Sequence, residues 1–80
     1  MTAKEARIRR RIRLMERIRL DAEKHGMTLR ELARQTGIAM TRMYALSDGS
    51  CRMTVEELHG ISRALARPME FFLREEDDGQ

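Results

Sequence analysis

The sequence predicts an all-α fold of five helices, and three observations support this prediction. Residues that favour helix dominate, apolar residues recur at spacings of three and four, and short runs of turn residues divide the chain. The chain has 80 residues, of which 41% are hydrophobic and 4% aromatic, which suits one small domain with a limited core. We expect one domain over residues 1–74, with a basic helical extension over 1–17, followed by an acidic disordered tail over 75–80.

The first helix is expected over about Ala3 to Lys24, because no glycine or proline interrupts this stretch. Ile8, Ile12 and Met15 recur at spacings of four and three, which gives the helix one apolar side. Gly26 supplies a left-handed cap that ends it. The pattern fits a helix that packs on the core and equally one that projects from it, with its apolar residues as a dimer seam.

The next two helices are short and are separated by a glycine. Thr28 followed by Glu31 can form a capping box, so a helix of about nine residues should begin there and end at Gly37. A third helix is expected over about Met40 to Leu46, because the residues at 47–50 are turn formers.

Thr54 and Glu57 repeat the capping-box pattern and begin a fourth helix. Its apolar stripe is formed by Val55, Leu58, Ile61 and Leu65. Pro68 then breaks the run and can begin a fifth short helix. This last helix contains Phe71 and Phe72, which offer a second candidate dimer seam, although core packing is favoured for at least one of them.

Basic charge is concentrated at the start of the chain. Residues 1–20 contain eight basic and two acidic residues, whereas residues 21–73 are balanced. Such a block is typical of nucleic-acid contacts. The alternative is a solvated helix face, with the acidic tail as its electrostatic partner.

Several classes of function are disfavoured. The single cysteine, Cys51, excludes an intrachain disulfide, and with His25 and His59 it does not have the spacing of a zinc site. The chain has no recognisable nucleophile and base pair and no glycine-rich phosphate loop. The longest uncharged run, residues 35–41, is too short to span a membrane. We therefore expect a cytoplasmic, nucleoid-associated protein that is not an enzyme and holds no cofactor or metal.

The second and third helices, joined by a tight turn at Gly37, form the pattern of a helix-turn-helix unit. In this motif the second helix enters the major groove of DNA. Burial of Met43 and Leu46 would fix that helix, which leaves Thr41 and Tyr44, together with their neighbours, free to project.

From about Ile18 to Leu73 the chain resembles the Cro/lambda-repressor helix-turn-helix family, also called the xenobiotic-response-element type. The resemblance is carried by two stretches, residues 27–50 and 53–73. The matching positions are the pair Leu32-Ala33 before Gly37, then Gly49, and finally Leu58, Ile61, Ala64 and Leu65. The resemblance implies five helices, a recognition helix over about Met40 to Leu46, and double-stranded DNA as the partner.

The candidate DNA-binding residues combine this resemblance with the basic first helix. They are Thr28, Met40, Thr41, Arg42, Tyr44, Ala45, Ser50, Arg52, Arg9, Arg10 and Arg13. The resemblance implies base-edge contacts from residues 40, 41 and 45, and phosphate contacts near residues 28, 42, 48, 50 and 52. Met40, Ala45 and the methyl group of Thr41 can contact thymine methyl groups, but the first two side chains cannot hydrogen-bond to bases.

Arg42 can bind guanine or phosphate, of which phosphate is the commoner use, and a solvated charge is the alternative. Tyr44 can contact phosphate or sugar, with an exposed packing residue as the alternative. The N-terminal arginines add phosphate contacts that would make binding more sensitive to salt.

The favoured function is a sequence-specific regulator of transcription that occupies an operator as a homodimer. One alternative is a protein-interaction adaptor of the antitoxin-like or polymerase-binding kind. Leu29 and Ala39 favour it, because the family often has glutamine and a serine or threonine cap at these positions. Asp48 favours it too, because a neutral or basic group there would suit phosphate better. The other alternative is nonspecific nucleic-acid binding, RNA included, through the N-terminal arginines.

Overall fold

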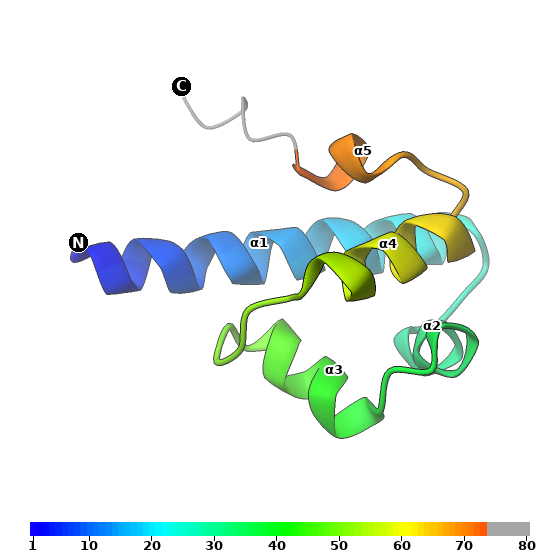
Figure 1. The fold of residues 1–80 in the computed structure, drawn as a ribbon, viewed down its shortest axis with the longest axis horizontal. Coiled ribbons are helices and arrows are strands. Elements are labelled where there is room, and N and C mark those ends of the chain that lie inside the picture. The colour runs from blue at the N-terminus through cyan, green and yellow to red at the C-terminus, as the bar shows by residue number, and fades with distance from the viewer. Residues whose placement is uncertain (74–80) are drawn as a thin grey trace.

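The computed structural model describes residues 1–73, and these residues form five helices and no strand. The helices are α1 (Ala3–Lys24), α2 (Leu29–Thr36), α3 (Met40–Ser47), α4 (Val55–Ala64) and α5 (Met69–Leu73). The all-α prediction is confirmed. In Figure 1, α2 and α3 lie on one side of the long helix α1, and α5 lies on the other. The predicted acidic tail at 75–80 lies outside the described residues.

Threonine side chains begin three of the helices. The side chains of Thr2 and Thr54 each accept a hydrogen bond from the backbone amide of the glutamate three residues later. The carboxylate of each glutamate accepts from the backbone amide of its threonine, which completes two capping boxes. At α2 only half of the expected box forms. Thr28 accepts from the amide of Glu31 at 3.0 Å, but the Glu31 carboxylate turns to Arg34 at 2.6 Å. The competing ion pair explains the difference.

Two of the helices are ended by glycines. Gly26 has a φ of 73° and Gly37 a φ of 77°, both in the left-handed region, as expected for the ends of α1 and α2. The amides of His25 and Met27 both donate to the carbonyl of Ala22, at 2.9 and 2.8 Å, so the turn after α1 satisfies one of the helix's last carbonyl groups.

Ala66 occupies the same left-handed position after α4, with a φ of 56°, and no other non-glycine residue in the described part has a positive φ. This conformation costs an L-residue about 1–2 kcal/mol. The Ala66 side chain is exposed, so replacing it loses no buried contact. We expect Ala66→Gly to raise the free energy of unfolding by ~0.5–1 kcal/mol in urea denaturation, part of the relief being offset by the freer unfolded chain. Gly26→Ala is the matched opposite and should lower it; two changes of the same sign would contradict this explanation.

The core is formed by residues from all five helices. Its members are Met15, Ile18, Ala22, Leu32, Ala33, Met43, Leu46, Leu58, Ile61, Phe72 and, just beyond the end of α4, Leu65. Phe72 is fully buried while Phe71 remains 36% exposed, so one of the two aromatic residues packs in the core, as expected. Met15 is only 3% exposed, so it belongs to the core and is not available to the dimer seam considered for it.

The N-terminal part of α1 packs on the loop between α3 and α4. Gly49 lies against Ile8 and Ile12, and its carbonyl accepts a hydrogen bond from Arg11 Nη1 at 2.9 Å. The structure thus places the part of α1 around Ile8, Arg11 and Ile12 on the domain, whereas the residues before this part extend beyond the other helices (Figure 1).

A buried ion pair connects α1 to the segment between α4 and α5. The Asp21 side chain is 3% exposed, and its carboxylate accepts from Arg67 Nη2 at 2.8 Å and from Arg67 Nε at 3.1 Å. The Arg67 guanidinium also lies 4.2 Å from the centre of the Phe71 ring. Hydrogen bonding from Arg67 lowers the pKa of Asp21, and burial opposes this shift only partly. The pair therefore holds the C-terminal helix against the first one.

Candidate nucleic-acid interface

Helix α3 is held by one side and exposes the other. Met43 and Leu46 are almost completely buried among residues of α1, α2 and α4. On the opposite side Thr41 is exposed and Tyr44 is 56% exposed, whereas Ala45 is half-buried. The buried residues fix the orientation of the helix, so the exposed side is presented in a defined direction, as a recognition helix requires.

Arg42 forms a two-pronged ion pair with Glu57 at the start of α4. Arg42 Nε lies 2.8 Å from Glu57 Oε2, and Arg42 Nη2 lies 2.9 Å from Glu57 Oε1. The same Nη2 donates to the backbone carbonyl of Arg52 at 3.0 Å. These hydrogen bonds join α3 to the start of α4, so Arg42 positions α3 against α4. The sequence indicated Glu57 as a helix cap but contained no sign that it also holds Arg42.

Glu57 remains ionised well into the acidic range. Its pKa is lowered from 4.5 to about 2, mainly by the hydrogen bonds from Arg42 and in part by the backbone amide of Thr54, while burial opposes the shift. A lowered pKa in the folded state stabilises the fold above the unfolded-state value. This contribution is lost as pH falls through the folded-state value.

We therefore expect the free energy of unfolding to fall between about pH 4.5 and pH 2. Denaturation at a series of pH values should show a smaller fall for Glu57→Gln than for the wild type, because the variant lacks this titrating group. Glu56→Gln, which removes an exposed carboxylate one position away, is the control. Parallel curves for wild type and Glu57→Gln would contradict the assignment.

The loop after α3 is closed by Asp48 and Ser50. The backbone amide of Ser50 donates to Asp48 Oδ1 at 2.9 Å, and the Ser50 hydroxyl contacts the same oxygen. These bonds lower the pKa of Asp48, which keeps an exposed negative charge beside α3. Ser50, expected at a phosphate, is exposed but engaged with Asp48, and Arg52 further along the loop is exposed.

Thr28, at the start of α2, is also exposed. Its hydroxyl oxygen accepts from the Glu31 amide, which leaves the hydroxyl hydrogen able to donate. Met40, at the start of α3, is half-buried against the core.

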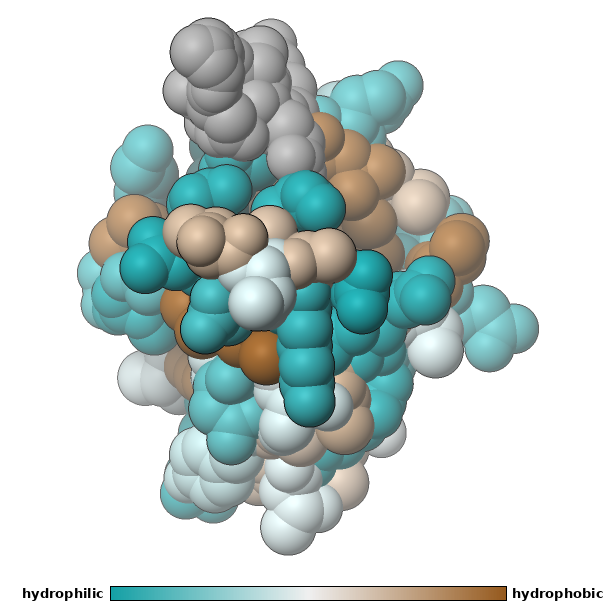
Figure 2. Space-filling view, turned by 90° about the vertical axis from the view of Figure 1, so that its left-hand side faces the viewer, coloured by the Kyte–Doolittle hydropathy of each residue, from teal (hydrophilic) through white to brown (hydrophobic). Residues whose placement is uncertain are grey.

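The N-terminal arginines lie along α1. Arg9 is exposed near Glu5 and Ile8. Arg10 and Arg13 line a groove that α1 forms with the α3–α4 loop, α4 and α5. From α3, Leu46 is the residue that lines this groove. The structure therefore places these two arginines beside Arg52 and not beside the exposed side of α3. Figure 2, which views the N-terminal end of α1, shows hydrophilic side chains over most of this face, with hydrophobic residues visible between them.

Comparison with known protein families identifies residues 17–70 as a Cro/C1-type HTH DNA-binding domain. This range covers more than half of the chain, so the protein belongs to the Cro/C1-type helix-turn-helix family, as the sequence resemblance indicated. The family is a DNA-binding one and not a catalytic one. No curated protein and no solved structure matches the chain.

Two further findings concern only residues 1–73. No helix there has both the length and the apolar character needed to cross a membrane. No group of three potential metal-binding side chains lies close together there.

Proposed function

We propose that the protein is a sequence-specific regulator of transcription that binds double-stranded DNA and acts by occupying an operator. The observation that carries this proposal is the exposed side of α3, with Thr41 and Tyr44 outward on a helix fixed by buried Met43 and Leu46. A rigid helix with hydroxyl-bearing side chains outward suits insertion into the major groove. We place the protein in the cytoplasm, on the nucleoid.

In this proposal the contacts divide into two groups. The first group faces the major groove of DNA and consists of Met40, Thr41, Tyr44 and Ala45. There the methyl groups suit thymine, and the Tyr44 hydroxyl suits sugar or phosphate. Phosphates on either side are bound by Thr28, Ser50 and Arg52, with Arg9, Arg10 and Arg13 extending the contacts. Arg42 contributes by orienting α3, because its guanidinium already holds Glu57.

We further propose a homodimer, since two copies related by a two-fold axis would bind the two half-sites of an operator. Burial of Met15 leaves α5 as the better seam. Phe71 is 36% exposed and Leu73 is 49% exposed on this helix, and both are large and apolar. A seam there would cover apolar surface that the monomer leaves in water.

Selection of bound duplexes from random DNA tests the proposal. The wild type should enrich a palindromic motif, and Thr41→Ala/Tyr44→Ala should lose it, with affinity for the selected site falling at least about tenfold. The matched control is Gln35→Ala/His59→Ala, which changes two exposed side chains that lie together on α2 and α4. Equal motifs and affinities for the wild type and the Thr41/Tyr44 variant would contradict sequence reading by α3.

A protein-interaction adaptor is the second candidate, and two observations favour it. Arg42 is engaged with Glu57, and Asp48 puts an ionised carboxylate beside the surface that would meet phosphate. In this case no motif would be selected, and the Thr41/Tyr44 variant would keep its biological activity. Salt-sensitive binding without a motif, lost in Arg9→Gln/Arg10→Gln/Arg13→Gln, would instead identify a nonspecific nucleic-acid binder.

A further inference from the structure

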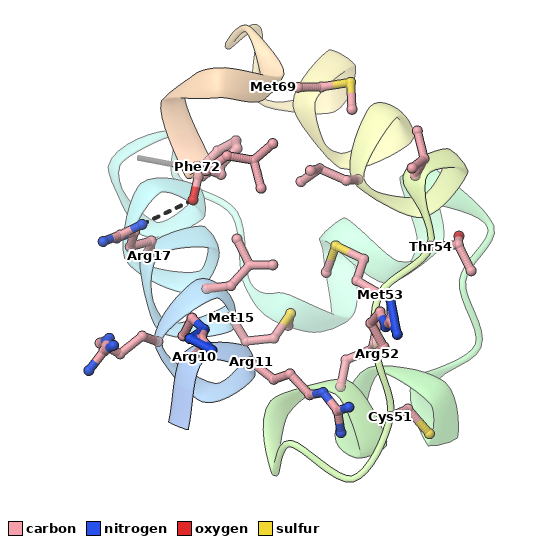
Figure 3. Close-up of a pocket in the computed structure, with 16 residues that line it drawn as sticks. Arg10, Arg11, Met15, Arg17, Cys51, Arg52, Met53, Thr54, Met69 and Phe72 are labelled. Atoms are coloured by element: carbon pink, nitrogen blue, oxygen red, sulfur yellow. Dashed lines mark hydrogen bonds between the residues drawn. The ribbon is translucent and has the colours of Figure 1, made fainter. Parts of the chain in front are cut away.

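A groove beside the arginines of α1 has an apolar floor. It has a volume of about 290 Å³ and lies between α1, the segment 51–55, α4 and α5. The floor is lined by Leu14, Met15, Leu46, Met53, Leu58, Met69 and Phe72. Figure 3 shows Met15, Met53 and Phe72 around the same open space. This volume is at the lower end of the range for small-molecule sites, roughly 300–1,000 Å³, so it suits a single short chain.

The edge of the groove carries positive charge. Five arginines line it, at positions 10, 11, 13, 17 and 52, and no acidic residue is among its described lining residues. Arg11 and Arg17 donate to the backbone carbonyls of Gly49 and Phe72, at 2.9 and 3.0 Å, so these side chains are fixed at the edge. Arg10 and Arg52 are exposed and come from α1 and from the α3–α4 loop. An apolar floor beneath such an edge is complementary to a molecule with an apolar body and an anionic head.

We propose that this groove binds a small amphiphilic carboxylate of medium chain length. The alkyl chain lies on the apolar floor, where the flexible thioether side chains of Met15, Met53 and Met69 adapt to it. The carboxylate pairs at the edge with an exposed guanidinium group, that of Arg10 on α1 or that of Arg52 on the α3–α4 loop, whose planar donors match two carboxylate oxygens. The inference concerns ligand binding alone, and because Arg10 and Arg52 are also proposed phosphate contacts, the carboxylate and DNA would compete for these two side chains.

The acidic end of the chain is the competing occupant. Residues 75–78 carry four carboxylates, but residues 74–80 contain no apolar side chain. They match the arginines by charge and offer nothing to cover the apolar floor. A carboxylate with an alkyl chain matches both parts of the groove, which is why we commit to it.

The seven methionines provide a direct measurement, because three line the groove and others lie elsewhere. The full chain is labelled with ¹³C at the methionine methyl groups and titrated with decanoate below its micelle concentration, and separately with 1-decanol. We expect saturable shifts at Met15, Met53 and Met69, with Met27 and Met40 unchanged, and tighter binding of decanoate than of decanol. Shifts at all methionines alike, no saturation, or equal affinity for the two ligands would overturn the proposal.

Variants test the role of charge. Arg10→Gln/Arg52→Gln should weaken decanoate binding about tenfold and leave decanol binding unchanged, because only the charged head is affected. Arg7→Gln/Arg63→Gln removes the same charge from two exposed arginines outside the groove and should leave both affinities unchanged. Equal weakening in the two double variants would overturn the assignment.

The last arm neutralises the acidic end of the chain with Glu75→Gln, Glu76→Gln, Asp77→Asn and Asp78→Asn. Decanoate shifts in the full wild-type chain support the proposal. Shifts that occur only in the neutralised chain would make the acidic segment the occupant of the groove and would overturn the proposal.

Discussion

Replacing Asp21 with alanine is expected to lower the free energy of unfolding by about 3 kcal/mol. Removing one partner of a buried ion pair costs about 3–5 kcal/mol, because the other charge stays desolvated. The lower end applies here, since the Arg67 side chain is 34% exposed and can turn toward water. A domain of this size has a total stability on the order of 4–12 kcal/mol, so the loss is a large part of it. Urea denaturation followed by circular dichroism measures the change.

The control is Glu23→Ala, which removes an exposed carboxylate of α1 that pairs with Arg19 at 2.9 Å. Exposed pairs contribute about 0–1 kcal/mol, so this variant should differ little from the wild type. The double variant Asp21→Ala/Arg67→Ala should lose less than the sum of its single variants, because no unpaired charge remains. Equal losses for Asp21→Ala and Glu23→Ala would show that burial gives the Asp21 pair no special weight.

Gly49→Ala is expected to lower the free energy of unfolding by about 2–3 kcal/mol. The glycine has a φ of 82°, which alone costs an L-residue about 1–2 kcal/mol. An added Cβ would also lie 2.8 Å from Ile8 Cγ2 and 3.0 Å from the Ile8 backbone oxygen. The side chain can turn away, but the backbone oxygen moves only if α1 shifts. Hydrogen exchange should therefore show weaker protection in the N-terminal half of α1.

Gly37→Ala separates these two causes. Gly37 has a φ of 77°, but an added Cβ would meet nothing within 4 Å. This variant should show the conformational cost alone, about 1–2 kcal/mol, with protection in the N-terminal half of α1 unchanged. Similar exchange patterns in the two variants would mean that the contact between Gly49 and Ile8 does not hold this part of α1.

Sequence reasoning worked best where the signal lies within a few residues. The start of α4 follows from Thr54 with the glutamate three residues later, and the end of α2 follows from Gly37. These caps act through hydrogen bonds between near neighbours, so the local sequence contains both partners. The third helix ends at Ser47, one residue beyond the expected end, a difference typical of frayed helix ends.

The pairings that organise the site join residues distant in sequence, and no local pattern predicts them. Arg42 and Glu57 are 15 residues apart, and Asp21 and Arg67 are 46 residues apart. Charge counts also say nothing about which side of a helix an arginine occupies. Arg10 and Arg11 are neighbours in sequence, but Arg10 is exposed at the edge of the groove, whereas Arg11 donates to Gly49.

The capping glutamate of α4 has a consequence for redesign. Glu57 Oε1 accepts from the Thr54 amide at 2.9 Å, and the same carboxylate holds Arg42. Arg42 thus adds to buried Met43 and Leu46 in fixing the orientation of α3, while the outward side chains at positions 41 and 44 take no part in the attachment of the helix to the core. A library that varies Thr41 and Tyr44 and preserves Arg42 should retain folded members throughout, so new binding preferences can be sought without losing the scaffold.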